Sequence, residues 1–74
     1  MIYYTGHAKG RMILRGITEE MVKNSLAKPD SVCVGYDDKS LVFKKFNRGT
    51  IKIVFISKKV HYVIVSVIWE IIKR

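Results

Sequence analysis

The chain has 74 residues, 49% of which are hydrophobic, and a formal net charge of +8 at pH 7. This length suits a single small domain over residues 1–74, and the apolar content excludes an intrinsically disordered chain. The basic balance favours a polyanionic partner such as RNA, DNA or an acidic protein, although the same charge could serve solubility alone.

Cysteine content and hydropathy restrict the cellular setting of the protein. Cys33 is the only cysteine, which excludes an internal disulfide and argues against a disulfide-rich secreted domain. The opening residues lack the apolar run of a signal peptide, and the longest apolar stretch, residues 63–69, is far shorter than the roughly 20 residues that span a bilayer. We therefore expect a soluble, cytoplasmic protein with no membrane association.

The first predicted element is a helix over residues 6–15. Thr5 is a suitable N-cap for it, and Gly16 is suited to end it. This helix is not cleanly amphipathic, because Leu14 falls beside a basic edge and Gly10 weakens the middle. Packing against the rest of the domain must therefore hold it in place.

A second helix is predicted between Thr18 and Pro29. Thr18 is the expected N-cap, and Glu19 and Glu20 lie where they complement the positive end of the helix dipole. Pro29 ends the helix, because the residue before a proline is disfavoured in the helical conformation.

From residue 31 onward the hydrophobic pattern alternates, which predicts strands starting near Ser31 and over residues 41–47, 50–57 and 60–69. Short loops between consecutive strands are typical of an antiparallel meander. We expect an α+β fold of two layers, in which two N-terminal helices pack on a four-stranded antiparallel sheet. The last strand is apolar on both faces, so it should lie inside the sheet or form a homo-oligomer contact.

A histidine and two arginines recur at four-residue spacing in the first predicted helix. His7, Arg11 and Arg15 would each advance by about 40° around the axis and would form one continuous edge. One proton-transfer group beside two permanent cations suits chemistry on a phosphodiester. Alternatively, His7 is a polar surface residue, and Arg15 interacts with the end of its own helix.

Four cations surround the second predicted hairpin and are candidate nucleic-acid ligands: Lys44, Lys45, Arg48 and Lys52. Phe43 and Phe46 alternate with them, so nucleic-acid bases could stack there. Lys44 and Lys45 point to opposite faces of their strand, so at most one of them can join a given site. The alternative is that these side chains only solvate the sheet.

Metal and cofactor motifs are missing from the sequence. The six carboxylates are scattered, no spacing of His, Cys, Asp and Glu indicates a metal site, and no glycine-rich phosphate loop or nucleophile elbow is present. We therefore expect chemistry that requires neither a metal nor a cofactor.

Several motifs together resemble a known protein family. The opening H-A-x-x-R-x-x-x-R-G-I-T-x-x-x-V, the helix ending in K-P-D-S-V and the final Val/Ile strand with an interior Ser resemble a widespread family of small prokaryotic proteins. That family is similar to the RelE-like toxins and the barnase–colicin ribonuclease fold. The resemblance covers essentially the whole chain and implies metal-independent RNA cleavage by His7, Arg11 and Arg15, with Ser66 where the family usually has Thr. The Ser66 hydroxyl could equally be hydrogen-bonded in the core.

The predicted function is therefore a toxin-like endoribonuclease that acts on RNA and is partnered by a small acidic antitoxin. His7 would serve as base or acid, and Arg11, helped by Arg15 or a hairpin lysine, would stabilise the transition-state charge. The sequence shows no second proton-transfer group. The alternative is a non-catalytic basic module that binds nucleic acid or a protein.

Overall fold

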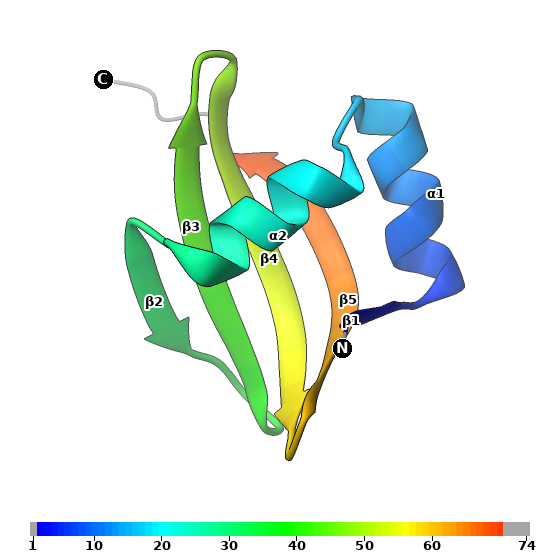
Figure 1. Cartoon of the computed structure of the whole chain (residues 1–74), viewed down its shortest axis with the longest axis vertical. Coiled ribbons are helices and arrows are strands. Elements are labelled where there is room, and N and C mark those ends of the chain that lie inside the picture. Colours follow the sequence, from blue (N-terminus) through cyan, green and yellow to red (C-terminus); the bar gives the residue numbers. More distant parts are fainter. Residues whose placement is uncertain (1, 71–74) are drawn as a thin grey trace.

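The computed structural model describes residues 2–70, which form one five-stranded sheet and two helices (Figure 1). In chain order the elements are β1 (Ile2–Tyr4), α1 (Gly6–Arg15), α2 (Glu19–Ala27), β2 (Ser31–Val34), β3 (Lys39–Phe46), β4 (Gly49–Lys58) and β5 (His61–Glu70). Among these residues, no helix is long and apolar enough to cross a membrane.

The strand order in the sheet is β1-β5-β4-β3-β2. The pairs β2–β3, β3–β4 and β4–β5 are antiparallel, whereas β1 runs parallel to β5 with Ile2 opposite Tyr62. The predicted four-stranded antiparallel sheet is therefore wrong, because the sheet is mixed and has a fifth strand. A strand of three residues is too short for an alternating pattern to be visible in the sequence.

Both helices begin at the capping residues that the sequence indicated, and α1 also ends at the predicted glycine. The Thr5 hydroxyl accepts a hydrogen bond from the backbone N–H of Ala8 at 3.0 Å, and the Thr18 hydroxyl accepts one from Met21 at 3.1 Å. Gly16 ends α1 in the left-handed conformation, with φ of 66°. These caps satisfy backbone groups that a helix cannot pair internally.

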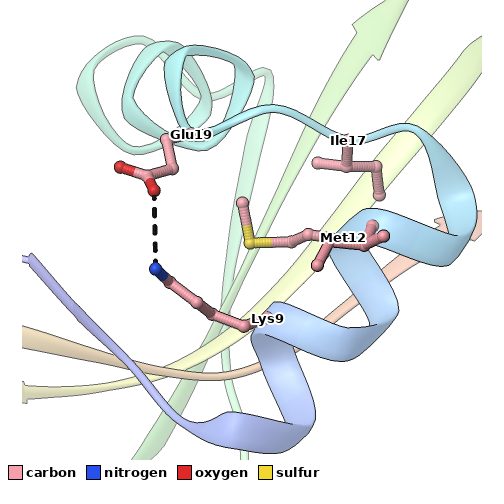
Figure 2. Close-up of a pocket in the computed structure, with 5 residues that line it drawn as sticks. Lys9, Met12, Ile17 and Glu19 are labelled. Atoms are coloured by element: carbon pink, nitrogen blue, oxygen red, sulfur yellow. Dashed lines mark ion pairs between the residues drawn. The ribbon is translucent and has the colours of Figure 1, made fainter.

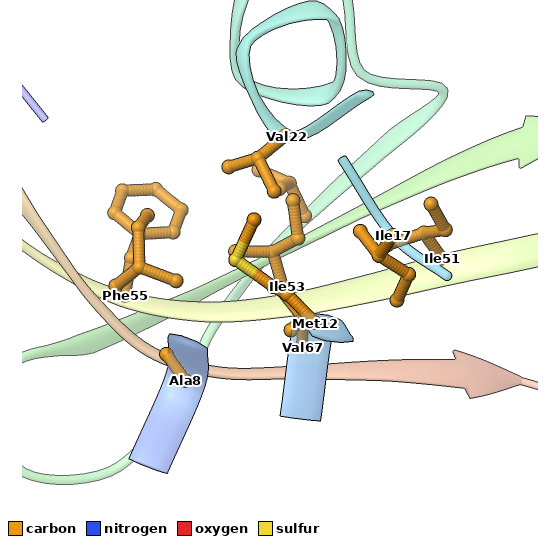
Figure 3. Packing of buried hydrophobic residues seen from close by; sticks show 10 residues of the cluster. Ala8, Met12, Ile17, Val22, Ile51, Ile53, Phe55 and Val67 are labelled. Carbon is orange, nitrogen blue, oxygen red and sulfur yellow. The ribbon is translucent and has the colours of Figure 1, made fainter. Parts of the chain in front are cut away.

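The hydrophobic core lies between one face of the sheet and the two helices (Figure 3). On β4, Ile51, Ile53 and Phe55 point toward the helices, and Met12 of α1 and Val22 of α2 cover them. We call this the helix-covered face, and the other side of the sheet the open face. The buried apolar residues come from both layers: Ala8, Met12, Ile17, Val22, Val42, Ile51, Ile53, Phe55, Ile64 and Val67.

An irregularity in β5 determines which of its side chains reach the core. Val54 pairs with Ser66 but Phe55 pairs with Ile64, so Val65 is an extra residue in the ladder. Ile64 and Val67 are consequently both fully buried although they are three positions apart. Ser66 then points to the open face of the sheet.

Candidate functional site

His7 and Arg11 lie together on one flank of α1. The buried face of this helix is formed by Ala8 and Met12, and His7 and Arg11 are displaced from Ala8 by about 100° and 60° to the same side. His7 is exposed and Arg11 is half-buried, and neither side chain forms a hydrogen bond or ion pair with any residue from 2 to 70. We call this pair the His7–Arg11 flank.

Arg15, one turn further along α1, has a different environment. Its guanidinium Nη1 donates a hydrogen bond to the Val67 carbonyl at 3.0 Å, and its own carbonyl accepts one from Trp69 Nε1 at 2.9 Å. The end of α1 is thereby attached to β5. The structure thus gives Arg15 a contact that holds helix to sheet, whereas the sequence analysis grouped it with His7 and Arg11.

Ser66 is not brought together with the His7–Arg11 flank. It lies opposite Val54 on the open face of the sheet, whereas α1 packs against β5 on the helix-covered face. The extra residue in β5 determines this orientation. No local signal indicates that extra residue, because the run of Val and Ile is apolar on either side of it.

The three hairpin lysines are divided between the two faces of the sheet. Lys44 lies on the helix-covered face and forms an ion pair with Asp30 at 3.8 Å, while Lys52 lies on the open face and pairs with Glu70 at 3.7 Å. Lys45 is exposed on the open face, and only its backbone N–H is engaged, donating to Asp30 Oδ2 at 2.7 Å. They do not form one continuous basic patch.

Arg48 lies in a cluster with Trp69 and the Arg15 carbonyl, which we call the aromatic corner and which the sequence did not indicate. Its guanidinium lies 5.2 Å from the centre of the Trp69 ring, in a cation–π contact. A Cβ added to Gly16 would come within 3.1 Å of Arg48 Nη1, so the turn after α1 approaches the same corner. Trp69 therefore links the end of α1, the β3–β4 turn and the end of β5. Arg15, Arg48 and Trp69 are too far apart in the sequence for their spacing to predict these contacts.

On the opposite flank of α1, a shallow cavity separates the two helices (Figure 2). Lys9 reaches across it to Glu19 at the start of α2, with 3.8 Å between Nζ and Oε2, and Met12 and Ile17 form the apolar floor. Its volume is about 230 Å³, below the range of about 300–1,000 Å³ typical of ligand pockets. We interpret it as space between helices rather than as a binding site.

Tyr4 lies beneath this ion pair. The Lys9 ammonium is 5.9 Å from the centre of its ring, and its hydroxyl is buried with no hydrogen-bond partner in the described part of the chain. Burial, and secondarily the negative charge of Glu19, raise the pKa of Tyr4 above its ordinary value of 10.0. Tyr4 is therefore a neutral phenol at physiological pH.

The described residues contain no cluster of three or more His, Cys, Asp and Glu side chains that could hold a metal ion.

Comparison with known proteins places the chain in a family. The sequence profile of the family described as a domain of unknown function, DUF4258, matches residues 4–69. No curated protein and no solved structure matches the chain. The matched residues include both helices, the His7–Arg11 flank and the aromatic corner. The chain therefore belongs to the DUF4258 family.

Proposed function

We propose that the protein is a toxin-like, metal-independent endoribonuclease that acts on RNA, with His7 as the proton-transfer residue and Arg11 as the phosphate-binding cation. The observation that carries this proposal is the His7–Arg11 flank, where an imidazole and a guanidinium lie on the same side of one helix and have no carboxylate partner among residues 2–70.

The pattern of ion pairs supports the choice of Arg11. Lys9, Lys44 and Lys52 each have a carboxylate within 4 Å, so their charges are partly neutralised by the protein itself. Arg11 has no such partner in the described part of the chain, and it is half-buried, which limits the positions its guanidinium can adopt. A guanidinium of this kind can bind a phosphate through two parallel hydrogen bonds.

The chemistry requires one proton to move twice. The neutral His7 imidazole would accept the proton of the ribose 2′-hydroxyl as its oxygen attacks the phosphorus. The bond from phosphorus to the 5′-oxygen then breaks, and that oxygen takes a proton from the imidazolium, which leaves a 2′,3′-cyclic phosphate. Arg11 would stabilise the extra negative charge that develops on the phosphoryl oxygens.

Purified protein, labelled RNA and EDTA provide the test, with His7→Gln compared with wild type. General acid–base catalysis contributes about 10²- to 10⁴-fold in rate, so we expect cleavage to fall by that factor while RNA binding is retained. His61→Gln is the matched control, because His61 packs against Tyr3 at the start of β5, outside the His7–Arg11 flank, and its replacement should leave cleavage unchanged. Cleavage by His7→Gln at the wild-type rate would exclude the proposed mechanism.

Arg11→Ala should weaken both RNA binding and cleavage, because the contact it removes is made to the phosphate. Lys23→Ala, which removes one positive charge from the exposed surface of α2, is the control for net charge. If Lys23→Ala lowers affinity as much as Arg11→Ala, binding follows net charge and Arg11 has no special role.

A second candidate is a non-catalytic RNA-binding module. It is favoured by one finding, that no second proton-transfer side chain within residues 2–70 is hydrogen-bonded to His7. The same assay separates the two, because a module of this kind would bind RNA with a steep dependence on salt but would never cleave it. A protein that neither binds nor cleaves RNA at low salt would rule out both candidates.

A further inference from the structure

We propose that β2 is a self-association edge, at which two copies of the chain pair antiparallel and join their sheets. β2 is the last strand of the sheet and is bonded only to β3, and all four of its residues are exposed. Its apolar side chains are accessible to an unusual degree, with Val32 63% exposed and Val34 91% exposed, and Tyr36 just beyond the strand is 90% exposed.

The edge at β2 lacks the features that normally prevent sheets from associating. Soluble proteins protect edge strands with charged residues, proline or bulges. β2 reads Ser-Val-Cys-Val, and its register with β3 is continuous. At the other side of the sheet, by contrast, the Arg15 guanidinium occupies the Val67 carbonyl of β5 beyond the end of β1. One edge is protected and the other is not.

The hydrogen-bonding pattern shows which backbone groups of β2 face outward. The Gly35 N–H donates to the Lys39 carbonyl at 2.8 Å, so Gly35 is in a hydrogen-bonded position toward β3. In an antiparallel ladder these positions alternate, which directs the peptide groups of Cys33 toward β3 as well. The N–H and C=O groups of Val32 and Val34 therefore point away from the sheet.

A second copy of β2 satisfies these groups in one particular register. When Cys33 lies opposite Cys33 of the second copy, each Val32 lies opposite a Val34 and the two residues exchange both of their backbone hydrogen bonds. Side chains opposite one another lie on the same face of the sheet, so the valines also cover each other. The arrangement is two-fold symmetric, as expected for a homodimer.

Charge distribution favours a second copy of this chain as the partner, despite the net charge of +8. Residues 31–36 are uncharged, Lys28 and Asp30 precede this stretch, and Asp37 and Asp38 follow it. Asp30 is paired with Lys44 of its own copy. Antiparallel pairing brings Lys28 of one copy near Asp37 and Asp38 of the other, twice over by symmetry, so these two aspartates face a basic residue across the interface.

Sedimentation equilibrium of the full chain in reducing buffer without RNA tests the proposal. We expect a reversible monomer–dimer equilibrium, and V34K should raise the dissociation constant at least about tenfold, because it places two ammonium groups beside the symmetry axis. L14K is the matched control: Leu14 is 78% exposed on α1, and its replacement should leave association unchanged. Circular dichroism of each variant verifies folding. A wild-type protein that stays monomeric up to millimolar concentration, or a V34K variant that dimerises as well as wild type, overturns the proposal.

Cys33 tests the register. Residues directly opposite one another in a non-hydrogen-bonded antiparallel pair have Cα atoms about 4.5 Å apart, within the range of about 4.4–6.8 Å found in disulfides. Mild oxidation should therefore link two wild-type chains through a Cys33–Cys33 disulfide. The V34K variant should form its disulfide-linked dimer more slowly. A stable dimer that resists this cross-link contradicts the register. Neither result depends on the ribonuclease proposal, because β2 lies at the opposite edge of the sheet from α1.

Discussion

At the scale of single residues, Arg11 and Arg15 show how two identical side chains on one helix come to have different roles. They are one turn apart, yet only Arg15 reaches a backbone acceptor, the carbonyl of Val67. β1 pairs with β5 only as far as Ile64. Beyond Ile64, the β5 carbonyls on the side away from β4 therefore have no neighbouring strand. The end of α1 lies over this stretch, and the Arg15 guanidinium supplies the missing donor.

This difference predicts opposite consequences of replacing each arginine. Arg15→Ala should lower the free energy of unfolding by about 1–3 kcal/mol, since it leaves a part-buried carbonyl without its partner. Arg11→Ala should change stability by no more than about 0.5 kcal/mol, as is usual for a surface side chain that forms no hydrogen bond or ion pair, and Arg11 forms none with residues 2–70. Urea unfolding monitored by the fluorescence of Trp69 measures both. Equal losses in the two variants would contradict the assigned roles.

At the scale of elements, Gly10 and Gly16 differ in backbone conformation. Gly10 lies within α1, and Gly16 is the residue that ends it. Gly10 lies inside α1 with open space around the position of a Cβ, whereas Gly16 has φ of 66° and lies close to Arg48. Gly10→Ala should therefore raise stability by about 0.5–1 kcal/mol, because alanine has the higher helix propensity. Gly16→Ala should lower stability by about 1 kcal/mol or more, since it places a side chain in a left-handed conformation and against a guanidinium. Thermal unfolding of both variants tests this, and a destabilised Gly10→Ala would refute it.

Sequence reasoning located the elements whose signals are local. Thr5 and Thr18 mark the helix starts correctly, because a cap acts within three residues of its own position. β1 was missed, since its only strand partner lies about sixty residues further along the chain. The bulge at Val65 was missed for a related reason, because it is visible only in the register between β4 and β5.

The same distinction applies to the candidate site. Helical spacing alone was enough to place His7 and Arg11 on one flank of α1. Placing Arg15 required the position of the Val67 carbonyl, and placing Ser66 required the bulge, neither of which is a local property. Strand alternation was enough to place Lys44 and Lys45 on opposite faces of the sheet. The ion pairs of Lys44 with Asp30 and of Lys52 with Glu70 could not be predicted, because the partners lie 14 or more positions away.

At the scale of the whole molecule, positive charge exceeds negative charge, with 14 lysines and arginines against 6 carboxylate side chains. The three ion pairs are all surface pairs, each worth about 0–1 kcal/mol, so they offset little of the repulsion among the cations. A net charge of +8 on a chain this small destabilises the compact state by self-repulsion. Dissolved anions should therefore stabilise the fold.

Thermal unfolding in sodium chloride and in sodium phosphate, at equal ionic strength, separates this general effect from binding at the His7–Arg11 flank. The melting temperature should rise with either salt, because screening acts on all the cations. If Arg11 binds phosphate, phosphate should stabilise the wild type more than chloride does, since a ligand that binds only the folded state raises its stability by mass action. Arg11→Ala should lose this extra stabilisation, whereas Lys23→Ala, with the same net charge, should keep it. Equal effects of the two salts on the wild type would show that Arg11 does not hold a phosphate, and the ribonuclease proposal would then lack its cation.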